Sequence, residues 1–153
     1  GVTSAGILTR TAQLGRQRIH TLDLMSGPAT QIRGAVGMDL AAIRGIAGDV
    51  ARVPFSNGSV QRVVVSNPQA AYLDEVARIL ADRGTLVVNG NTRNPFISRA
   101  LRDPDALRAL GLEMVEEGVA LLGEFAGHEF YNQDTQRRIP NDSMRSWVLR
   151  RIR

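Results

Sequence analysis

One short stretch near the carboxyl terminus gathers most of the side chains that could carry out acid–base chemistry. It contains His128, Glu129 and Tyr131, and it is followed by Arg137 and Arg138. Cleavage of RNA without a metal ion needs a base for the 2′-hydroxyl group, an acid for the leaving oxygen, and cations for the charge that develops on phosphorus. These residue types predict an RNA-cleaving centre. The alternative is that the stretch is a polar loop that only connects two strands.

The other histidine of the chain is His20, and there is no cysteine. We take His20 as a weaker second candidate for the general base, because it lies beside the first expected strand. With two histidines and no thiolate, a transition-metal site would depend on carboxylate ligands, so we predict no metal site.

A second group of candidate residues lies where the first expected strand ends. Residues 20–30 form a short apolar run that ends in an acidic residue and continues into a turn with one glycine, Gly27. In a doubly wound sheet the first strand leads to such a loop, where backbone amides and a helix N-terminus bind a ligand. Residues 22–29 resemble the Leu-Asp-Leu-Gly-x-Gly-x-Gly signature of class I S-adenosylmethionine-dependent methyltransferases, with Met25 and Ala29 in place of the outer glycines.

The resemblance implies a site for the methyl donor at the ends of the first strands. Asp39 matches the carboxylate that binds the ribose in that family, and Asp49 matches the acidic residue that approaches the adenine. If S-adenosylmethionine binds, the resemblance assigns it to Asp23, Gly27, Asp39, Asp49 and Asn67. A side chain at Met25 stands where the family brings bare backbone against the ligand. Our first interpretation is therefore that the donor site is lost and that no cofactor binds.

Two further motifs resemble the same family. Residues 53–60 are similar to the Leu-Pro-Phe-x-Asp-Gly-Ser-Phe-Asp run that leads into the fourth strand of many methyltransferases. Asn67 and Pro68 resemble the start of the Asn-Pro-Pro-Tyr motif, in which the asparagine oxygen holds the amino group to be methylated. In this chain Gln69 replaces the second proline and the aromatic residue is displaced to Tyr72. The alternative is a simple turn after a strand.

The composition favours a polyanionic partner. All 19 basic residues are arginine, the net charge is +4 and the isoelectric point is near 10.8. Guanidinium groups bind phosphate as planar two-pronged donors, so nucleic acid is a reasonable partner. Genomic base composition is the alternative explanation of the arginine bias. No apolar run approaches the roughly 20 residues of a membrane helix, so we expect a soluble domain.

The periodicity predicts one α/β domain over residues 1–153, with an N-terminal helical segment at 1–18 and an α/β core at 19–152. Strands are expected at 19–24, 35–40, 45–50, 61–66, 85–89, 111–122 and 144–152, and helices at 70–83 and 95–110. Asp103 before Pro104 predicts an interruption of the second helix, because this pair is typical of a helix start. The predicted fold is a Rossmann-like, methyltransferase-type mixed sheet of about seven strands, mostly parallel, with an antiparallel last strand and shortened first crossovers.

Two functions of different classes follow. In the first, the fold has lost its donor and acts on RNA as a toxin or effector, such as a tRNA-cleaving ribonuclease. Small, cysteine-free, arginine-rich domains resemble the C-terminal toxin domains of bacterial polymorphic and contact-dependent growth inhibition proteins. That resemblance implies a longer secreted bacterial protein, delivery into a target-cell cytoplasm, and a neutralising immunity protein.

In the second function, the chain is an active methyltransferase that acts on nucleic acid or a small molecule. A third alternative is an inert subunit that stabilises an active partner.

Overall fold

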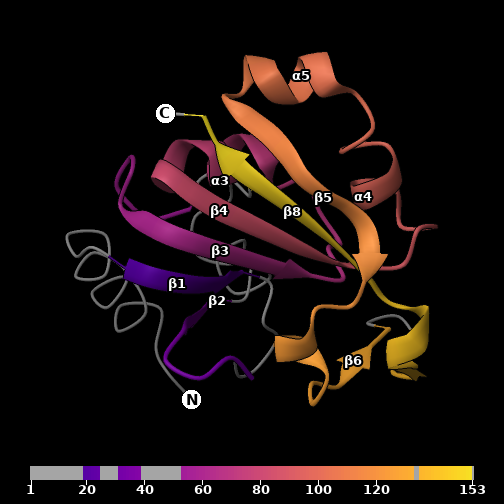
Figure 1. Cartoon of the computed structure of the whole chain (residues 1–153). Helices are drawn as coiled ribbons and strands as arrows, with labels where there is room; N and C mark the ends of the chain where they lie inside the picture. Colours follow the sequence, from indigo (N-terminus) through magenta and orange to yellow (C-terminus); the bar gives the residue numbers. More distant parts are fainter. Residues whose placement is uncertain (1–18, 25–30, 39–52, 133–134, 153) are drawn as a thin grey trace.

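The computed structural model describes residues 19–24, 31–38, 53–132 and 135–152 (Figure 1). In this part of the chain, six strands form one twisted sheet. Across the sheet they are β2 Val36–Met38, β1 Ile19–Leu24, β3 Val60–Ser66, β4 Leu80–Gly90, β8 Arg145–Arg151 and β5 Leu112–Ala120. The segment at 1–18, the strand expected at 45–50, and Gly27, Asp39 and Asp49 lie outside the described residues.

The pairing of the strands confirms the predicted fold class. β2, β1, β3 and β4 run parallel to one another, whereas β8 is antiparallel to both of its neighbours, β4 and β5. The chain thus forms a mixed α/β sheet that is mostly parallel and contains one antiparallel strand, the last of the sequence. This is the arrangement of the methyltransferase-type Rossmann-like fold.

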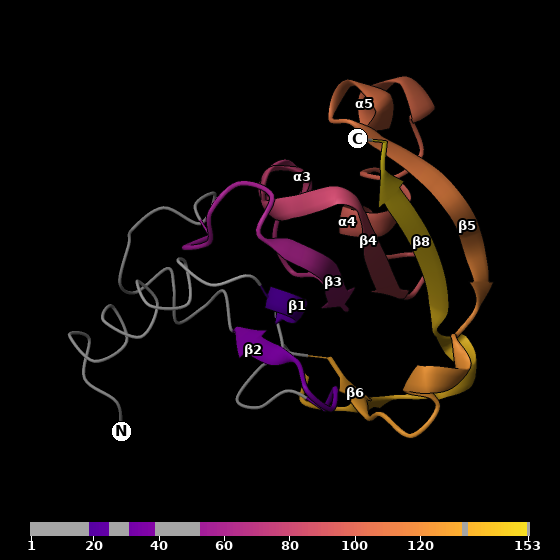
Figure 2. The same cartoon turned by 60° about the vertical axis from the view of Figure 1, so that its left-hand side comes forward.

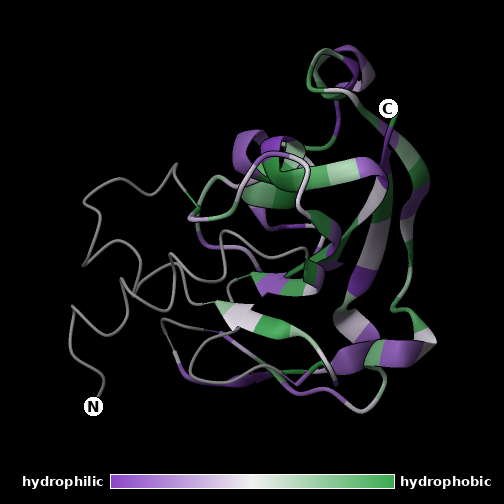
Figure 3. Ribbon diagram, turned by 90° about the vertical axis from the view of Figure 1, so that its left-hand side faces the viewer, coloured by the Kyte–Doolittle hydropathy of each residue, from purple (hydrophilic) through white to green (hydrophobic). Residues whose placement is uncertain are grey.

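The central strand β3 is covered on both faces, as its run of three valines predicts. Val63 and Val65 belong to the larger apolar core, and Val64 belongs to a second core on the opposite face. The larger core lies under three helices, α3 Leu73–Ile79, α4 Pro95–Ser98 and α5 Pro104–Ala109. Apolar residues, green in Figure 3, gather on the inner strands, while hydrophilic residues colour much of the surrounding helices and loops.

The expected interruption of the helix at 95–110 is confirmed. The carboxylate of Asp103 accepts hydrogen bonds from the backbone nitrogens of Asp105, at 3.0 Å, and Ala106, at 3.3 Å. Pro104 occupies the first helical position, where its missing N–H group costs nothing. Asp103 therefore begins α5 as a separate helix.

The helix expected at 70–83 is shorter than predicted. α3 ends at Ile79, and β4 begins at Leu80, which pairs with Val60 of β3. Leu80 is fully buried, so the sheet takes over where the helical pattern of the sequence continues. Gly84, inside β4, permits a close approach of backbone groups, because a Cβ atom there would stand 2.8 Å from one backbone carbonyl oxygen and 2.9 Å from another.

Arg78 of α3 fastens the loop that leads into β3. Its guanidinium group donates to the carbonyl oxygens of Val53, at 2.6 Å, and Phe55, at 2.7 Å, and to the side chain of Asn57, at 2.9 Å. Glu75 of the same helix pairs with it at 2.5 Å. The run at 53–60 is thus a loop that leads into β3, and one arginine satisfies the carbonyl groups of Val53 and Phe55 in it.

A long connection between β5 and β8 covers the other face of the sheet. We call residues 121–144 the cap. It contains η1 Gly123–Phe125, a hairpin of β6 Phe130–Tyr131 and β7 Arg138–Ile139, and η2 Asn141–Ser143. Phe125, Phe130 and Met144 of the cap form the second core with Val64 and Val87. Figure 2 shows β6 and its neighbours along one side of the sheet, with α3 on the other.

The search for membrane spans in the described residues finds no helix that is both long and apolar enough to cross a bilayer.

Candidate functional site

The parallel strands β1, β3 and β4 end at one edge of the sheet, which we call the carboxyl edge. Asp23 stands one residue before the end of β1, is 6% exposed, and pairs with Val64 of β3. Asn67 follows directly after the last residue of β3. These are the two donor-site candidates in the described residues, and the structure places both at the carboxyl edge. In open α/β sheets, ligands bind outside this edge.

Asn67 links the end of β3 to two other segments. Its backbone nitrogen donates to the carbonyl oxygen of Asn89 at 2.7 Å, and its side-chain nitrogen donates to the carbonyl oxygen of Tyr131 in the cap at 3.1 Å. Asn94 donates to the side-chain oxygen of Asn67 at 3.5 Å and to the carbonyl oxygen of Pro68 at 2.9 Å. Asn67 has a φ of 47°, a left-handed conformation that asparagine tolerates better than most residues. The amide nitrogen is thus occupied, while the side-chain oxygen has one long contact among the described residues, from Asn94.

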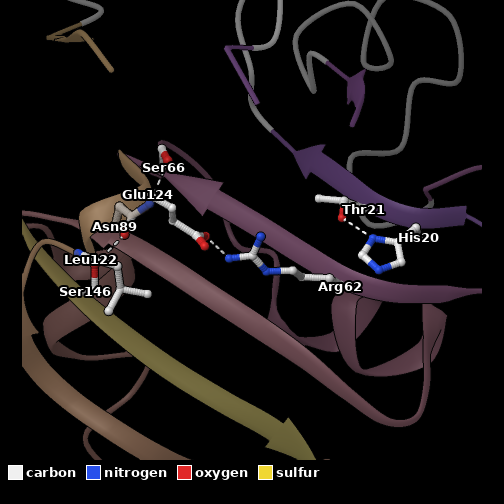
Figure 4. A network of polar contacts seen from close by, with 8 residues as sticks. All are labelled: His20, Thr21, Arg62, Ser66, Asn89, Leu122, Glu124 and Ser146. Carbon is white, nitrogen blue, oxygen red and sulfur yellow. Dashed lines mark hydrogen bonds and ion pairs between the residues drawn. The ribbon is translucent and has the colours of Figure 1, made fainter. Parts of the chain in front are cut away.

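A buried polar network lies at the end of β3, where Ser66 precedes Asn67 in the sequence, and Figure 4 shows its residues Ser66, Asn89, Leu122 and Ser146. Ser146 donates to the side-chain oxygen of Asn89 at 2.7 Å and accepts from the backbone nitrogen of Leu122 at 3.1 Å, and Asn89 donates to Ser66 at 3.3 Å. The network joins β3, β4 and β8 to the first residues of the cap. Sequence reasoning missed it, although a polar residue after the apolar run Val87–Val88 is a signal for it.

His128 packs as an aromatic side chain inside the cap. Its ring meets the ring of Phe125 edge-on, with the centroids 5.3 Å apart and the planes at 81°, and it lies 6.4 Å from the ring of Phe130. Within the described residues, no hydrogen bond reaches a nitrogen of this ring. The backbone carbonyl of His128 accepts from Asn141 at 3.0 Å. These contacts fix the ring among phenylalanines.

The other candidates for RNA cleavage in this stretch meet on the hairpin. The Tyr131 hydroxyl donates to the Glu129 carboxylate at 2.8 Å, and Tyr131 pairs with Arg138 across the hairpin. The hydrogen bond that Tyr131 donates to Glu129, followed by the negative charge of Glu129, raises the pKa of Tyr131 above its usual value. Arg137 lies in the same turn, where its carbonyl accepts from the backbone nitrogen of Asn132 at 2.8 Å. Glu129, Tyr131 and Arg138 are therefore one exposed cluster.

His20 lies near the beginning of β1, far along the strand from the carboxyl edge, as Figure 4 shows. Its Nδ1 atom is 2.7 Å from the Thr21 hydroxyl. The structure does not bring His20 to the strand ends that carry Asp23 and Asn67.

Arginines border the carboxyl edge. Arg93 follows the end of β4, Arg145 stands opposite Gly90 at the start of β8, and Arg137 and Arg138 lie in the hairpin. All four are exposed, and none forms an ion pair with another described residue. We call these four residues the arginine rim.

Arg62 differs from the rim because it is partly covered by the cap. It forms an ion pair with Glu124, and its guanidinium lies 5.9 Å from the centre of the Phe125 ring. Burial lowers the pKa of Arg62.

No group of three or more histidine, aspartate or glutamate side chains in the described part of the chain is arranged to hold a metal ion.

A cavity of about 410 Å³ lies on the opposite face, between α3, α4 and α5. The buried Tyr72 forms part of its wall and donates from its hydroxyl to the carbonyl oxygen of Phe96 at 2.9 Å. Glu75, another lining residue, is paired with Arg78. The polar groups of Tyr72 and Glu75 are thus already satisfied, while Asp74 and Arg99 also line the cavity. Because ligands of open α/β sheets bind outside the carboxyl ends of the strands, the carboxyl edge is the better candidate for a specific ligand site.

Comparisons with known proteins agree with this topology. No family profile matches the sequence, and no curated protein is significantly similar to it. The structure of the antibiotic-resistance methyltransferase Kmr is similar, at 15% identity and a TM-score of 0.50, over 99% of this chain and 95% of that one. A chain in the complex of the Haloferax volcanii Trm112 methyltransferase activator with a methyltransferase matches at 17% identity and a TM-score of 0.50, over 95% of this chain and 89% of that one. At such identities the similarity shows the fold alone: the chain has a methyltransferase-type fold.

Proposed function

We propose that the protein is a methyltransferase that binds S-adenosylmethionine at the carboxyl edge and methylates a nitrogen of RNA. The observation that carries the proposal is the position of Asn67, which follows β3 at the edge where the fold binds ligands. Its side-chain oxygen accepts one contact, at 3.5 Å from Asn94. A carbonyl oxygen has two acceptor positions, so it retains capacity for the amino group of a substrate base.

The described residues fit a donor in part. Asp23 provides a nearly buried carboxylate at the end of β1, next to β3, which is the chemistry needed to accept hydrogen bonds from a polar cosubstrate. Gly27, Asp39 and Asp49 remain predictions from the sequence. The cosubstrate would supply an electrophilic methyl group. The protein's own part would be to hold the accepting nitrogen in line with that group and to keep water away.

The arginine rim supports RNA as the substrate class. Arg93 follows the end of β4 and Arg145 begins the adjacent antiparallel strand β8, so both lie at the carboxyl edge. Arg138 lies in the hairpin, and Asn67 contacts this hairpin at Tyr131. Guanidinium groups without carboxylate partners are free to bind phosphate. Phosphates held along the rim would bring a base to Asn67.

The test is transfer of a labelled methyl group from S-adenosylmethionine to unfractionated tRNA and ribosomal RNA. We expect label in RNA with the unaltered protein and at least a tenfold lower rate with Asn67→Ala. The matched control is Gln61→Ala, an exposed side chain near the other end of β3, which should retain the rate. Absence of transfer together with absence of donor binding would contradict the proposal.

The second candidate is the metal-independent RNA cleavage of a toxin domain. The cluster of Glu129, Tyr131 and Arg138 favours it, because a carboxylate, a phenol and a cation meet on one exposed surface. The edge-on packing of the His128 ring against Phe125 weakens it. Incubation with tRNA in the absence of donor tests it: discrete fragments that His128→Ala and Tyr131→Phe reduce would favour cleavage, and intact tRNA would favour methyl transfer.

A further inference from the structure

Gln31 joins two segments that are far apart in the sequence. Its side-chain nitrogen donates to the carbonyl oxygen of Glu129 at 2.8 Å, and its side-chain oxygen accepts from the backbone nitrogen of Glu129 at 2.9 Å. One carboxamide thus satisfies both backbone groups of one residue of the cap. A pair of parallel hydrogen bonds fixes orientation as well as distance.

The two segments are the turn that precedes β2 and the cap. Gln31 follows the glycine-containing stretch that resembles the donor loop, and the turn after it closes with a hydrogen bond from the Ala35 backbone nitrogen to the carbonyl oxygen of Ile32 at 3.2 Å. Glu129 belongs to the cap, which also carries Tyr131. Ile32 packs against the second core, beside Phe125 and Phe130. The turn and the cap are therefore held together by the Gln31 pair and by apolar contact.

The cap has a second tether at the carboxyl edge. Asn67 donates to the carbonyl oxygen of Tyr131, two residues after Glu129. The cap is thus attached to the turn before β2 through Gln31 and to the end of β3 through Asn67. A shift of either attachment moves the same short piece of backbone.

We propose that Gln31 is a positioning residue that couples the two halves of the site, so that binding of the methyl donor strengthens binding of RNA. This inference rests on the proposed function. Gln31 itself is exposed and acts through the backbone of Glu129. By linkage, RNA strengthens donor binding by the same factor.

We call the two hydrogen bonds between Gln31 and the backbone of Glu129 the clasp. Removing the clasp should abolish the coupling between donor binding and RNA binding and leave the fold intact. Because Gln31 and Glu129 are both exposed, water can replace the lost hydrogen bonds, and the stability should change little. The apolar contact of Ile32 would still hold the turn near the cap, but the paired hydrogen bonds that fix its orientation would be lost. This difference separates a positioning role from a merely structural one.

The experiment is calorimetric titration of S-adenosylhomocysteine with and without saturating tRNA. We expect tRNA to strengthen binding at least about fivefold in the unaltered protein, within the usual range of allosteric coupling. Gln31→Ala should reduce this factor to about one while each separate affinity stays within about twofold. Gln31→Glu, which retains an acceptor and loses the donor, should give an intermediate factor. Gln61→Ala, an exposed glutamine at the other end of the sheet, is the matched control and should retain the full factor.

Amide hydrogen exchange at Glu129 checks the clasp without any ligand, since Gln31→Ala should speed exchange at that position. Coupling that survives in Gln31→Ala, or absence of coupling in the unaltered protein, would overturn the inference while leaving the proposed function in place. Absence of S-adenosylhomocysteine binding to the unaltered, folded protein would overturn the proposed function and the inference together.

Discussion

Ser146 of β8 donates a hydrogen bond to Asn89 of β4 at 2.7 Å, and both side chains are completely buried. The same serine oxygen accepts from the backbone nitrogen of Leu122, where the cap begins. The pair therefore fixes the point at which the cap leaves the sheet.

Replacement of this serine should destabilise the fold. Ser146→Ala leaves the Asn89 oxygen and the Leu122 nitrogen without their partner, and a buried polar group left unpaired costs about 1–3 kcal/mol. Urea unfolding followed by circular dichroism measures the loss. Ser98→Ala, at an exposed serine of α4, should change the free energy of unfolding by less than about 0.5 kcal/mol. Equal stability of the two variants would show that the network does not support the cap.

Arg78 should be hard to replace even by lysine. A single ammonium group cannot reach the carbonyl oxygens of Val53 and Phe55 and the Asn57 side chain in the geometry of the guanidinium. We expect Arg78→Lys to lower the free energy of unfolding by about 1–3 kcal/mol. The exposed Arg102→Lys serves as the comparison in the same urea titration. An unchanged midpoint for Arg78→Lys would mean that the loop at 53–60 does not depend on this side chain.

The N-cap of α5 gives a smaller and more local effect. Asp103→Ala removes the acceptor for the nitrogens of Asp105 and Ala106 and should cost about 1 kcal/mol. Asp103→Asn keeps a capping oxygen and should stay within a few tenths of a kcal/mol. Thermal unfolding of both variants tests this order, and the reverse order would rule out capping as the role of Asp103.

The buried Tyr72 should make the protein less stable in alkali. Burial raises the pKa of Tyr72, so the folded protein keeps this proton at a pH where the unfolded chain loses it. The contribution of Tyr72 to the free energy of unfolding is therefore fully present below about pH 10, the pKa of tyrosine in the unfolded chain. It declines as the pH rises above this value, by up to about 1.4 kcal/mol per pH unit. Tyr72→Phe should flatten this dependence in urea titrations between neutral and alkaline pH. A slope that is unaffected by Tyr72→Phe would assign the alkaline loss to other groups.

The features that the sequence predicted well are those determined by neighbouring residues. Three consecutive valines are enough to predict a strand buried on both faces, and Asp103 before Pro104 is enough to predict a helix start. The candidate site was predicted only in part because its geometry depends on distant partners. Gln31 and Glu129 are 98 residues apart, and Asn67 and Tyr131 are 64 apart. No local pattern specifies such pairs, and none showed that the His128 ring would pack against Phe125 instead of facing Glu129.

Binding of S-adenosylhomocysteine to the purified protein tests the account most directly. We predict calorimetric binding in the micromolar range, about −8 kcal/mol, with at least tenfold weaker binding to Asp23→Asn at unchanged circular dichroism. No detectable heat of binding to the folded, unaltered protein at millimolar ligand would contradict the account.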